Sequence, residues 1–204
     1  MRRFVFYYLL TVLFATLPVT GNQLPVRQTD TLETSALTFI RHGFYDAVES
    51  HQATNRTIDF IETKYSEEFI HSEPVLLAYY GVLKALKAKH VFSPFSKISY
   101  LRSALRILDE AAIEGACNLE VRFLRFSVLH NIPSFLGFGD RLRQDADAVF
   151  VLLVIDEKYR ELHPEMALNV IEFVLESELL SDEQQQELEL LAQRLQADEQ
   201  LSLD

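Results

Sequence analysis

The chain has little cysteine, glycine or proline, and it has no tryptophan. Its 204 residues include one Cys, six Gly and six Pro. The single cysteine, Cys117, excludes an internal disulfide bond and every CxxC metal or redox motif. So few glycines and prolines disfavour a β-sandwich or barrel, which requires a turn about every ten residues. No GxSxG, HxxxH or HExxH motif and no glycine-rich phosphate loop occurs either. The sequence therefore favours a non-enzymatic protein, and we predict no catalytic residue, metal or cofactor.

Net charge restricts the partners of the protein. The formal charge is -11, and an acidic chain repels a phosphate backbone, so generic nucleic-acid binding is excluded. The acid is concentrated at the C-terminus, where residues 165–204 contain eleven Asp or Glu and one basic residue, Arg194. We interpret this part as a solvated helical face. The alternative is a docking surface for a basic partner.

The N-terminus has the pattern of a secretory signal peptide. Arg2 and Arg3 precede an almost wholly apolar stretch that ends in small residues at Val19-Thr20-Gly21. The stretch is too short for a comfortable membrane span of about 20 residues, although an uncleaved anchor remains an alternative. We predict a signal peptide at 1–21 and a polar leader at 22–29. The mature protein would then be exported to the bacterial periplasm or secreted, without spanning the membrane.

Apolar side chains recur at intervals of three or four residues through the rest of the chain, which is typical of amphipathic helices. A first helix from about Asp30 is followed by a polar break at 51–57 and a second helix at 57–68. The run 75–83 is apolar on every face, which indicates a central, buried helix. We predict an all-α fold of about eight helices in a single domain at 30–204.

Several helix starts are visible in the sequence. Ser93-Pro94 interrupts the buried helix, and Ser96 opens the next one. Asn118 caps the helix after that, and Ser181 with Gln184 forms a capping box before the last helix. The helix that follows Asn118 carries two apolar sides and one basic edge. Its two sides hold Val121, Leu124 and Val128, and Phe123 and Phe126; its edge holds Arg122 and Arg125.

Two stretches resemble tetratricopeptide hairpins. The segment Phe39-Ile40-Arg41-His42-Gly43-Phe44-Tyr45-Asp46-Ala47-Val48-Glu49 resembles the turn between the two helices of such a repeat. Ala104, Leu108 and Ala111, followed by Asn118, resemble the second helix of a repeat that leads into the next. The chain departs from the family pattern because it has no tryptophan and no strict 34-residue period. The resemblance implies antiparallel hairpins in a right-handed array, or an irregular bundle.

A second resemblance covers roughly residues 73–155. The segments are Lys89-His90-Val91-Phe92-Ser93-Pro94-Phe95-Ser96-Lys97, Glu120-Val121-Arg122-Phe123-Leu124-Arg125-Phe126 and His130-Asn131-Ile132-Pro133-Ser134-Phe135-Leu136-Gly137. They look like a family of uncharacterised exported bacterial proteins with no assigned activity. This resemblance implies export and a helical fold, and it adds no chemistry.

The densest group of polar residues lies near turns and helix ends in the same region. Its members are His90, Lys97, Arg122, Arg125, His130 and Asn131. One interpretation is a metal site in which His90 and His130 join a carboxylate. A second is an anion site, because Arg122 and Arg125 present planar donors to a carboxylate or phosphate. In a third, the groups are structural and pair with helix ends, Asp109, Glu110 or Glu120.

An aromatic cluster accompanies these polar residues. Its members are Phe92, Phe95, Tyr100, Phe123, Phe126, Phe135 and Phe138. We expect it to be core, with a ligand pocket or peptide groove as the alternative. The loop 131–139 should be an ordered plug packed on the helix 75–91 and the turn 92–95. If the loop is instead a recognition element, Phe135→Ala should weaken partner binding and leave the melting temperature unchanged.

These observations favour an exported helical scaffold that binds another protein or a peptide. Helical hairpins stack into extended surfaces, and no catalytic motif competes with that interpretation. The alternative is a small-ligand or anion-binding protein, or less plausibly a metal-dependent enzyme, with its site around His90, Arg122, Arg125 and His130.

Overall fold

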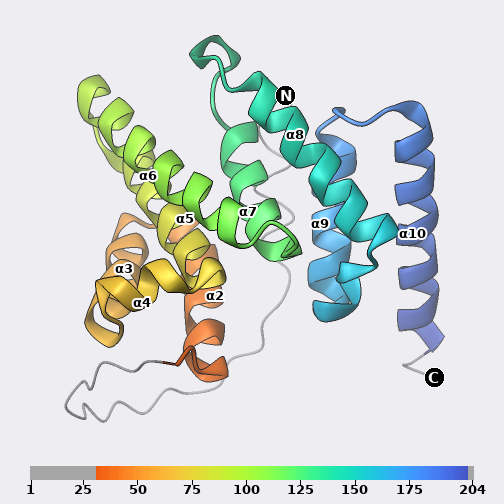
Figure 1. Ribbon diagram of the computed structural model, residues 1–204, viewed down its shortest axis with the longest axis horizontal. Helices are drawn as coiled ribbons and strands as arrows, with labels where there is room; N and C mark the ends of the chain where they lie inside the picture. The colour runs from red at the N-terminus through yellow and green to blue at the C-terminus, as the bar shows by residue number, and fades with distance from the viewer. Residues whose placement is uncertain (1–30, 202–204) are drawn as a thin grey trace.

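The computed structural model describes residues 31–201, and this part of the chain is helical without strands (Figure 1). It contains nine α-helices, of which all but the six-residue α4 are at least twelve residues long. This confirms the predicted all-α class. The helices are α2 (Thr34–Glu49), α3 (His51–Lys64), α4 (Glu67–Ser72), α5 (Pro74–His90), α6 (Pro94–Glu114), α7 (Leu119–His130), α8 (Gly139–Phe150), α9 (Pro164–Glu176) and α10 (Asp182–Leu201). Short η1 (Ser134–Leu136), η2 (Val151–Ile155) and η3 (Lys158–Glu161) lie between them.

The segments predicted as signal peptide, 1–21, and polar leader, 22–29, lie outside the described residues. Among residues 31–201, no helix is long and apolar enough to cross a membrane.

Two predicted helix starts are confirmed by side-chain caps. The Asn118 side chain accepts a hydrogen bond from the Val121 amide at 3.0 Å. Ser181 and Gln184 bond reciprocally at 2.9 and 3.3 Å, as a capping box requires. The predicted start at Ser96 is wrong, since α6 begins at Pro94 with Ser93 as its cap. Proline suits the first helical position because its missing N–H is unpaired there in any helix.

The predicted polar break at 51–57 is also wrong, because this segment is the first half of α3. The turn lies at Ser50, so residues 39–49 are helical throughout and do not form the turn that the tetratricopeptide resemblance implied. Two threonines in this segment account for the wrong prediction of a polar break. Thr54 and Thr57 are fully buried, and each hydroxyl donates to a backbone carbonyl, Thr54 to Ala47 at 3.1 Å and Thr57 to Ala53 at 2.9 Å. Polar residues can therefore face the core here at little cost.

Two apolar cores share helix α7. The first lies among α2 to α7 and includes Ile40, Ile61, Leu77 and Leu83, so the apolar run 75–83 is the buried centre that the sequence predicts. The second lies among α7 to α10. Val121, Leu124 and Val128 of α7 pack in the first core, whereas Phe123 and Phe126 pack in the second. The predicted two-sided character of this helix is confirmed.

The aromatic cluster does not form a core. Phe126 is buried, but Phe92, Phe95 and Phe135 are 101%, 87% and 83% exposed. The predicted plug 131–139 is therefore wrong, because its η1 turn projects beyond the ends of α7 and α8 (Figure 1), where no helix covers it. The proposed groove on α5 does not receive the loop, since α2, α3, α4, α6 and α7 cover α5 instead.

Glycines allow two pairs of helices to approach closely. A Cβ atom added at Gly43 of α2 would lie 2.3 Å from the Thr57 hydroxyl of α3. At Gly81 of α5 it would lie 2.8 Å from the Cγ of Leu108 in α6. At Gly139, by contrast, no atom lies within 4 Å of the same position.

We expect Gly43→Ala to destabilise the protein by about 1–3 kcal/mol, because the new methyl group overpacks a buried and rigid Thr57. The clash should outweigh the roughly 1 kcal/mol by which Ala exceeds Gly in a helix. Urea unfolding followed by circular dichroism measures the change, with Gly139→Ala as the neutral control. The double variant Gly43→Ala/Thr57→Ala should be more stable than the sum of the single effects; strict additivity would contradict the proposed contact.

Candidate functional site

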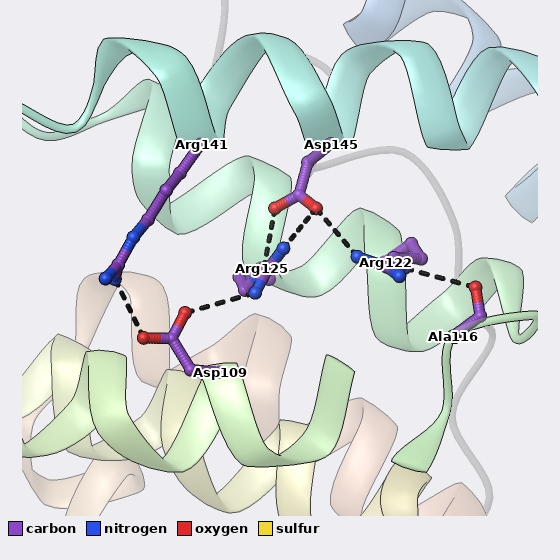
Figure 2. Close-up of polar contacts among 6 residues, drawn as sticks. All are labelled: Asp109, Ala116, Arg122, Arg125, Arg141 and Asp145. Carbon is purple, nitrogen blue, oxygen red and sulfur yellow. Dashed lines mark hydrogen bonds and ion pairs between the residues drawn. The ribbon is translucent and has the colours of Figure 1, made fainter. Parts of the chain in front are cut away.

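Helix α7 presents Arg122 and Arg125 to helix α8, where both bind Asp145 (Figure 2). Arg125 binds this carboxylate with two donors, Nε to Oδ2 at 2.7 Å and Nη2 to Oδ1 at 2.6 Å. Arg122 Nη1 adds a third hydrogen bond to Oδ1 at 3.2 Å, and its Nε donates to the Ala116 carbonyl at 3.1 Å. Asp145 is fully buried, so this is a buried, bidentate ion pair.

Asp109 of α6 extends the network to a third helix. It accepts hydrogen bonds from Arg125 Nη1 at 3.1 Å and from Arg141 Nη1 of α8 at 2.8 Å (Figure 2). Burial alone would lower the pKa of Arg125, but hydrogen bonding to Asp145 and the charges of both aspartates raise it above its usual value. The arginine therefore stays charged, and its charge is balanced within the protein.

The predicted structural partners of the arginines are thus partly confirmed. Asp109 pairs with Arg125 as expected, whereas Glu110 pairs with His71 at 2.6 Å and Glu120 with Arg41. Asp145 was visible in the sequence only as one of several aspartates after His130. The signal that could have found it is its position on the apolar side of α8, between Leu142 and Ala146 in the stripe that also includes Val149.

A second buried polar centre escaped the sequence analysis. Glu120 of α7 accepts two hydrogen bonds from Arg41 of α2, at 2.8 and 2.6 Å, and one from the Tyr79 hydroxyl of α5. Hydrogen bonding to Glu120 raises the pKa of Arg41, and burial beside Glu120 raises that of Tyr79 well above its usual value. Sequence offers no signal for this triad, since its members are 38 and 41 residues apart.

A shallow cavity of about 210 Å³ adjoins this second centre. It is lined by residues of the segment before α2 and of α2, α5, α7 and η3. They include Leu37, Arg41, Val75, Glu120, Lys158 and Glu161. Both of its cations are already paired, Arg41 with Glu120 and Lys158 with Glu161. An anionic ligand would have to displace one of these carboxylates in order to bind there.

The remaining predicted site residues lie apart from one another. His90 at the end of α5 lies 3.5 Å from the Ala47 carbonyl and beside the ring of His51. His130 contacts Phe126 and Phe173 instead. The Asn131 amide donates to the Ser127 carbonyl at 2.8 Å, and Lys97 is exposed near the start of α6. The described residues contain no group of three His, Cys, Asp or Glu side chains that could hold a metal ion.

Comparison of the sequence and structure with protein-family models, with curated proteins and with solved structures gives no match.

We expect Asp145→Asn to destabilise the fold by about 3–5 kcal/mol, because the charge of Arg125 would remain buried without its main partner. Urea unfolding followed by circular dichroism measures this change. Asp147→Asn is the matched control, since Asp147 is exposed on the same helix. Equal stability of the two variants would show that the ion pair does not hold α7 to α8.

His130 should make stability pH-dependent. Partial desolvation beside Phe126 and Phe173 lowers the pKa of His130, although the residue is still partly exposed, so the unfolded chain binds a proton there more readily than the folded protein. The stabilising effect of the neutral ring is complete above the unfolded pKa of about 6.5, and it is lost as pH falls through the folded pKa. Between about pH 7.5 and pH 5, the melting temperature of His130→Gln should fall less than that of the wild type. Parallel profiles would contradict this assignment.

Proposed function

We propose that this protein is an exported helical scaffold that binds another protein through the exposed loop between α7 and α8. The observation that carries the proposal is the 83% exposure of Phe135 at the centre of that loop. An aromatic side chain so fully hydrated gains free energy when a partner covers it, roughly 25 cal/mol for each Å² removed from water. Single exposed aromatics are common, so the geometry of the loop matters as well.

The loop has a defined conformation without tight packing. Leu136 and Gly137 donate backbone hydrogen bonds to Pro133 and Ser134, at 3.0 and 3.1 Å. Gly137 has a φ of 79°, a left-handed conformation that favours glycine. Pro133 further restricts the chain. A preformed loop loses less conformational entropy on binding, which suits a recognition element.

Charge around the loop favours a particular partner. Arg143 is exposed on the first turns of α8, as is Arg141, which also bonds to Asp109 at 2.8 Å, and Asp140 is the one acidic residue among them. We infer that the partner presents an apolar pocket for Phe135 with acidic residues at its rim. Complementary charges of this kind increase the rate of association and the specificity of binding.

The other parts of the proposal come from the sequence and from helix pairing. Consecutive helices α2 and α3, α5 and α6, and α9 and α10 contact one another along the chain. This pairing supports a degenerate tetratricopeptide-like arrangement, in which small residues such as Gly43 and Gly81 allow close approach. Export rests on the pattern of residues 1–21 alone.

A small-ligand or anion-binding function around His90, Arg122, Arg125 and His130 is less well supported. Both arginines donate hydrogen bonds to Asp145, and His90 and His130 contact different residues. An anion would therefore compete with a carboxylate that is already buried and bidentate.

A photo-crosslinking amino acid at position 135 tests the proposal in the cells that produce the protein. Position 113 is the control, because Ile113 is 72% exposed on α6, away from the loop. We expect a defined protein adduct from position 135 and none from position 113. The crosslinked partner, once purified, should bind the wild type and the Ile113→Ala variant equally, and Phe135→Ala at least about tenfold more weakly, as loss of a central aromatic contact predicts.

The melting temperature of Phe135→Ala should remain that of the wild type, because surface substitutions change stability by less than about 0.5 kcal/mol. A destabilised variant would mean that Phe135 is structural, and equal partner binding would mean that the loop is not the contact surface. Either result would overturn the proposal.

A further inference from the structure

The α5–α6 hairpin has a charge unlike the rest of the chain. From Pro74 to Leu108 there is no Asp or Glu, and there are six Lys or Arg, within a protein whose formal charge is -11. Two of these lysines bind neighbouring helices: Lys84 of α5 pairs with Glu62 of α3 at 2.9 Å, and Lys89 of α5 donates to the Val48 carbonyl of α2 at 2.6 Å. Lys87 lies between them on α5, and the other three basic residues lie on α6.

The tip of this hairpin is apolar and uncovered. We define the tip as residues 91–103, the turn between α5 and α6 with the first half of α6. Phe92 and Phe95 are 101% and 87% exposed, and Ile98 and Tyr100 are also exposed. Figure 1 shows that the tip lies at an extremity of the molecule, and the near-complete exposure of Phe92 and Phe95 means that no neighbouring element covers it.

Three basic residues follow the exposed aromatic residues along α6. Lys97, Arg102 and Arg106 are exposed on α6 and make no ion pair with any residue of the described chain, 31–201. In contrast, the cations at the centre of the molecule, Arg122 and Arg125, are paired internally. The charges on α6 are therefore available to an anionic surface.

From this arrangement we propose that the α5–α6 tip binds peripherally to an anionic lipid bilayer. Phe92 and Phe95 enter the boundary between headgroups and acyl chains, while Lys97 and Arg102 contact lipid phosphates. The spacing fits this placement: seven residues separate Phe95 from Arg102, which is about 10 Å along a helix. Apolar side chains of interfacial helices reach about 5–10 Å into this boundary. Tyr100 lies between the two levels, where tyrosine is favoured.

A bilayer suits the tip better than a protein partner does. An uncovered aromatic tip requires a deep complementary pocket in a protein, whereas a fluid lipid surface adapts to it. The uneven distribution of charge over the molecule gives a second argument. The acidic helices α9 and α10 lie at the edge of the molecule opposite the tip (Figure 1), so an anionic surface attracts one end and repels the other. The inference uses residues of α5 and α6 only and does not depend on the loop between α7 and α8.

The chain lacks tryptophan, so Phe92→Trp introduces a unique fluorescent reporter at the tip. It is measured in the full chain with vesicles of phosphatidylglycerol and phosphatidylcholine, and with vesicles of phosphatidylcholine alone. We expect a blue shift with the anionic vesicles and quenching by brominated acyl chains. The matched reporter is Ile113→Trp, at the other end of α6, which should not respond. Because each reporter senses only its own surroundings, membrane contact made elsewhere on the chain does not imitate the signal.

The charge requirement is tested in the same reporter variant. Each basic residue near an anionic surface contributes about fivefold to binding, so Lys97→Gln with Arg102→Gln should raise the lipid concentration at half-maximal shift about 25-fold. Arg194→Gln, on the acidic α10, should change it less than twofold. Circular dichroism confirms that the variants remain folded.

Three results would overturn the proposal: no blue shift with anionic vesicles, an equal shift with phosphatidylcholine alone, or a shift produced by a protein from the producing cells and not by vesicles. The crosslinking experiment at position 135 is unaffected by any of them, so failure at the tip and failure at the loop are distinguishable.

Discussion

The buried ion pair between Arg125 and Asp145 is the contact on which the rest of the structure depends. It joins α7 to α8 inside the molecule, and Asp109 extends it to α6. Helix α7 is apolar on two sides, so apolar packing fixes its rotation less strictly than it would for a helix with one apolar side. The bidentate geometry selects one rotation, because a rotated helix would leave the charge of Arg125 without its partner. Val121 and Leu124 then face one core, and Phe126 faces the other.

The same contact explains why the centre of the protein offers little chemistry. Arginines near helix turns are natural candidates for anion binding, and the sequence places Arg122 and Arg125 one turn apart. Their donors are directed to Asp145, Asp109 and the Ala116 carbonyl. The side chains that the molecule exposes most fully are instead aromatic, and they lie on the loop around Phe135 and at the tip of the α5–α6 hairpin.

Local signals in the sequence predicted the local features of the fold. Asn118 and Ser181 cap helices as their residue types indicate, and the apolar run 75–83 is buried on all sides. Errors arose where polar side chains bond to the nearby backbone and so can be buried in a helix. Thr54 and Thr57 indicate a loop by composition, yet their hydroxyls bond to the helical backbone and allow burial.

The candidate site was less predictable because its contacts join residues far apart in the sequence. Arg41, Tyr79 and Glu120 lie on α2, α5 and α7 and meet only after these three helices have packed, so no spacing in the sequence reflects their contact. For the aromatic residues of the loops, the sequence predicted burial and the structure shows exposure. Burial was inferred for Phe135 from its residue type, but a side chain at the end of a hairpin is buried only if another element reaches it.

Helix α7 is a wall common to both cores, and this has a consequence for dividing the chain. A fragment that stops before Leu119 would lack Val121 and Leu124 and leave the first core open on one side. A fragment that begins after His130 would lack Phe126, and its Asp145 would have no arginine. Within residues 31–201, both cores therefore depend on side chains of one helix, α7.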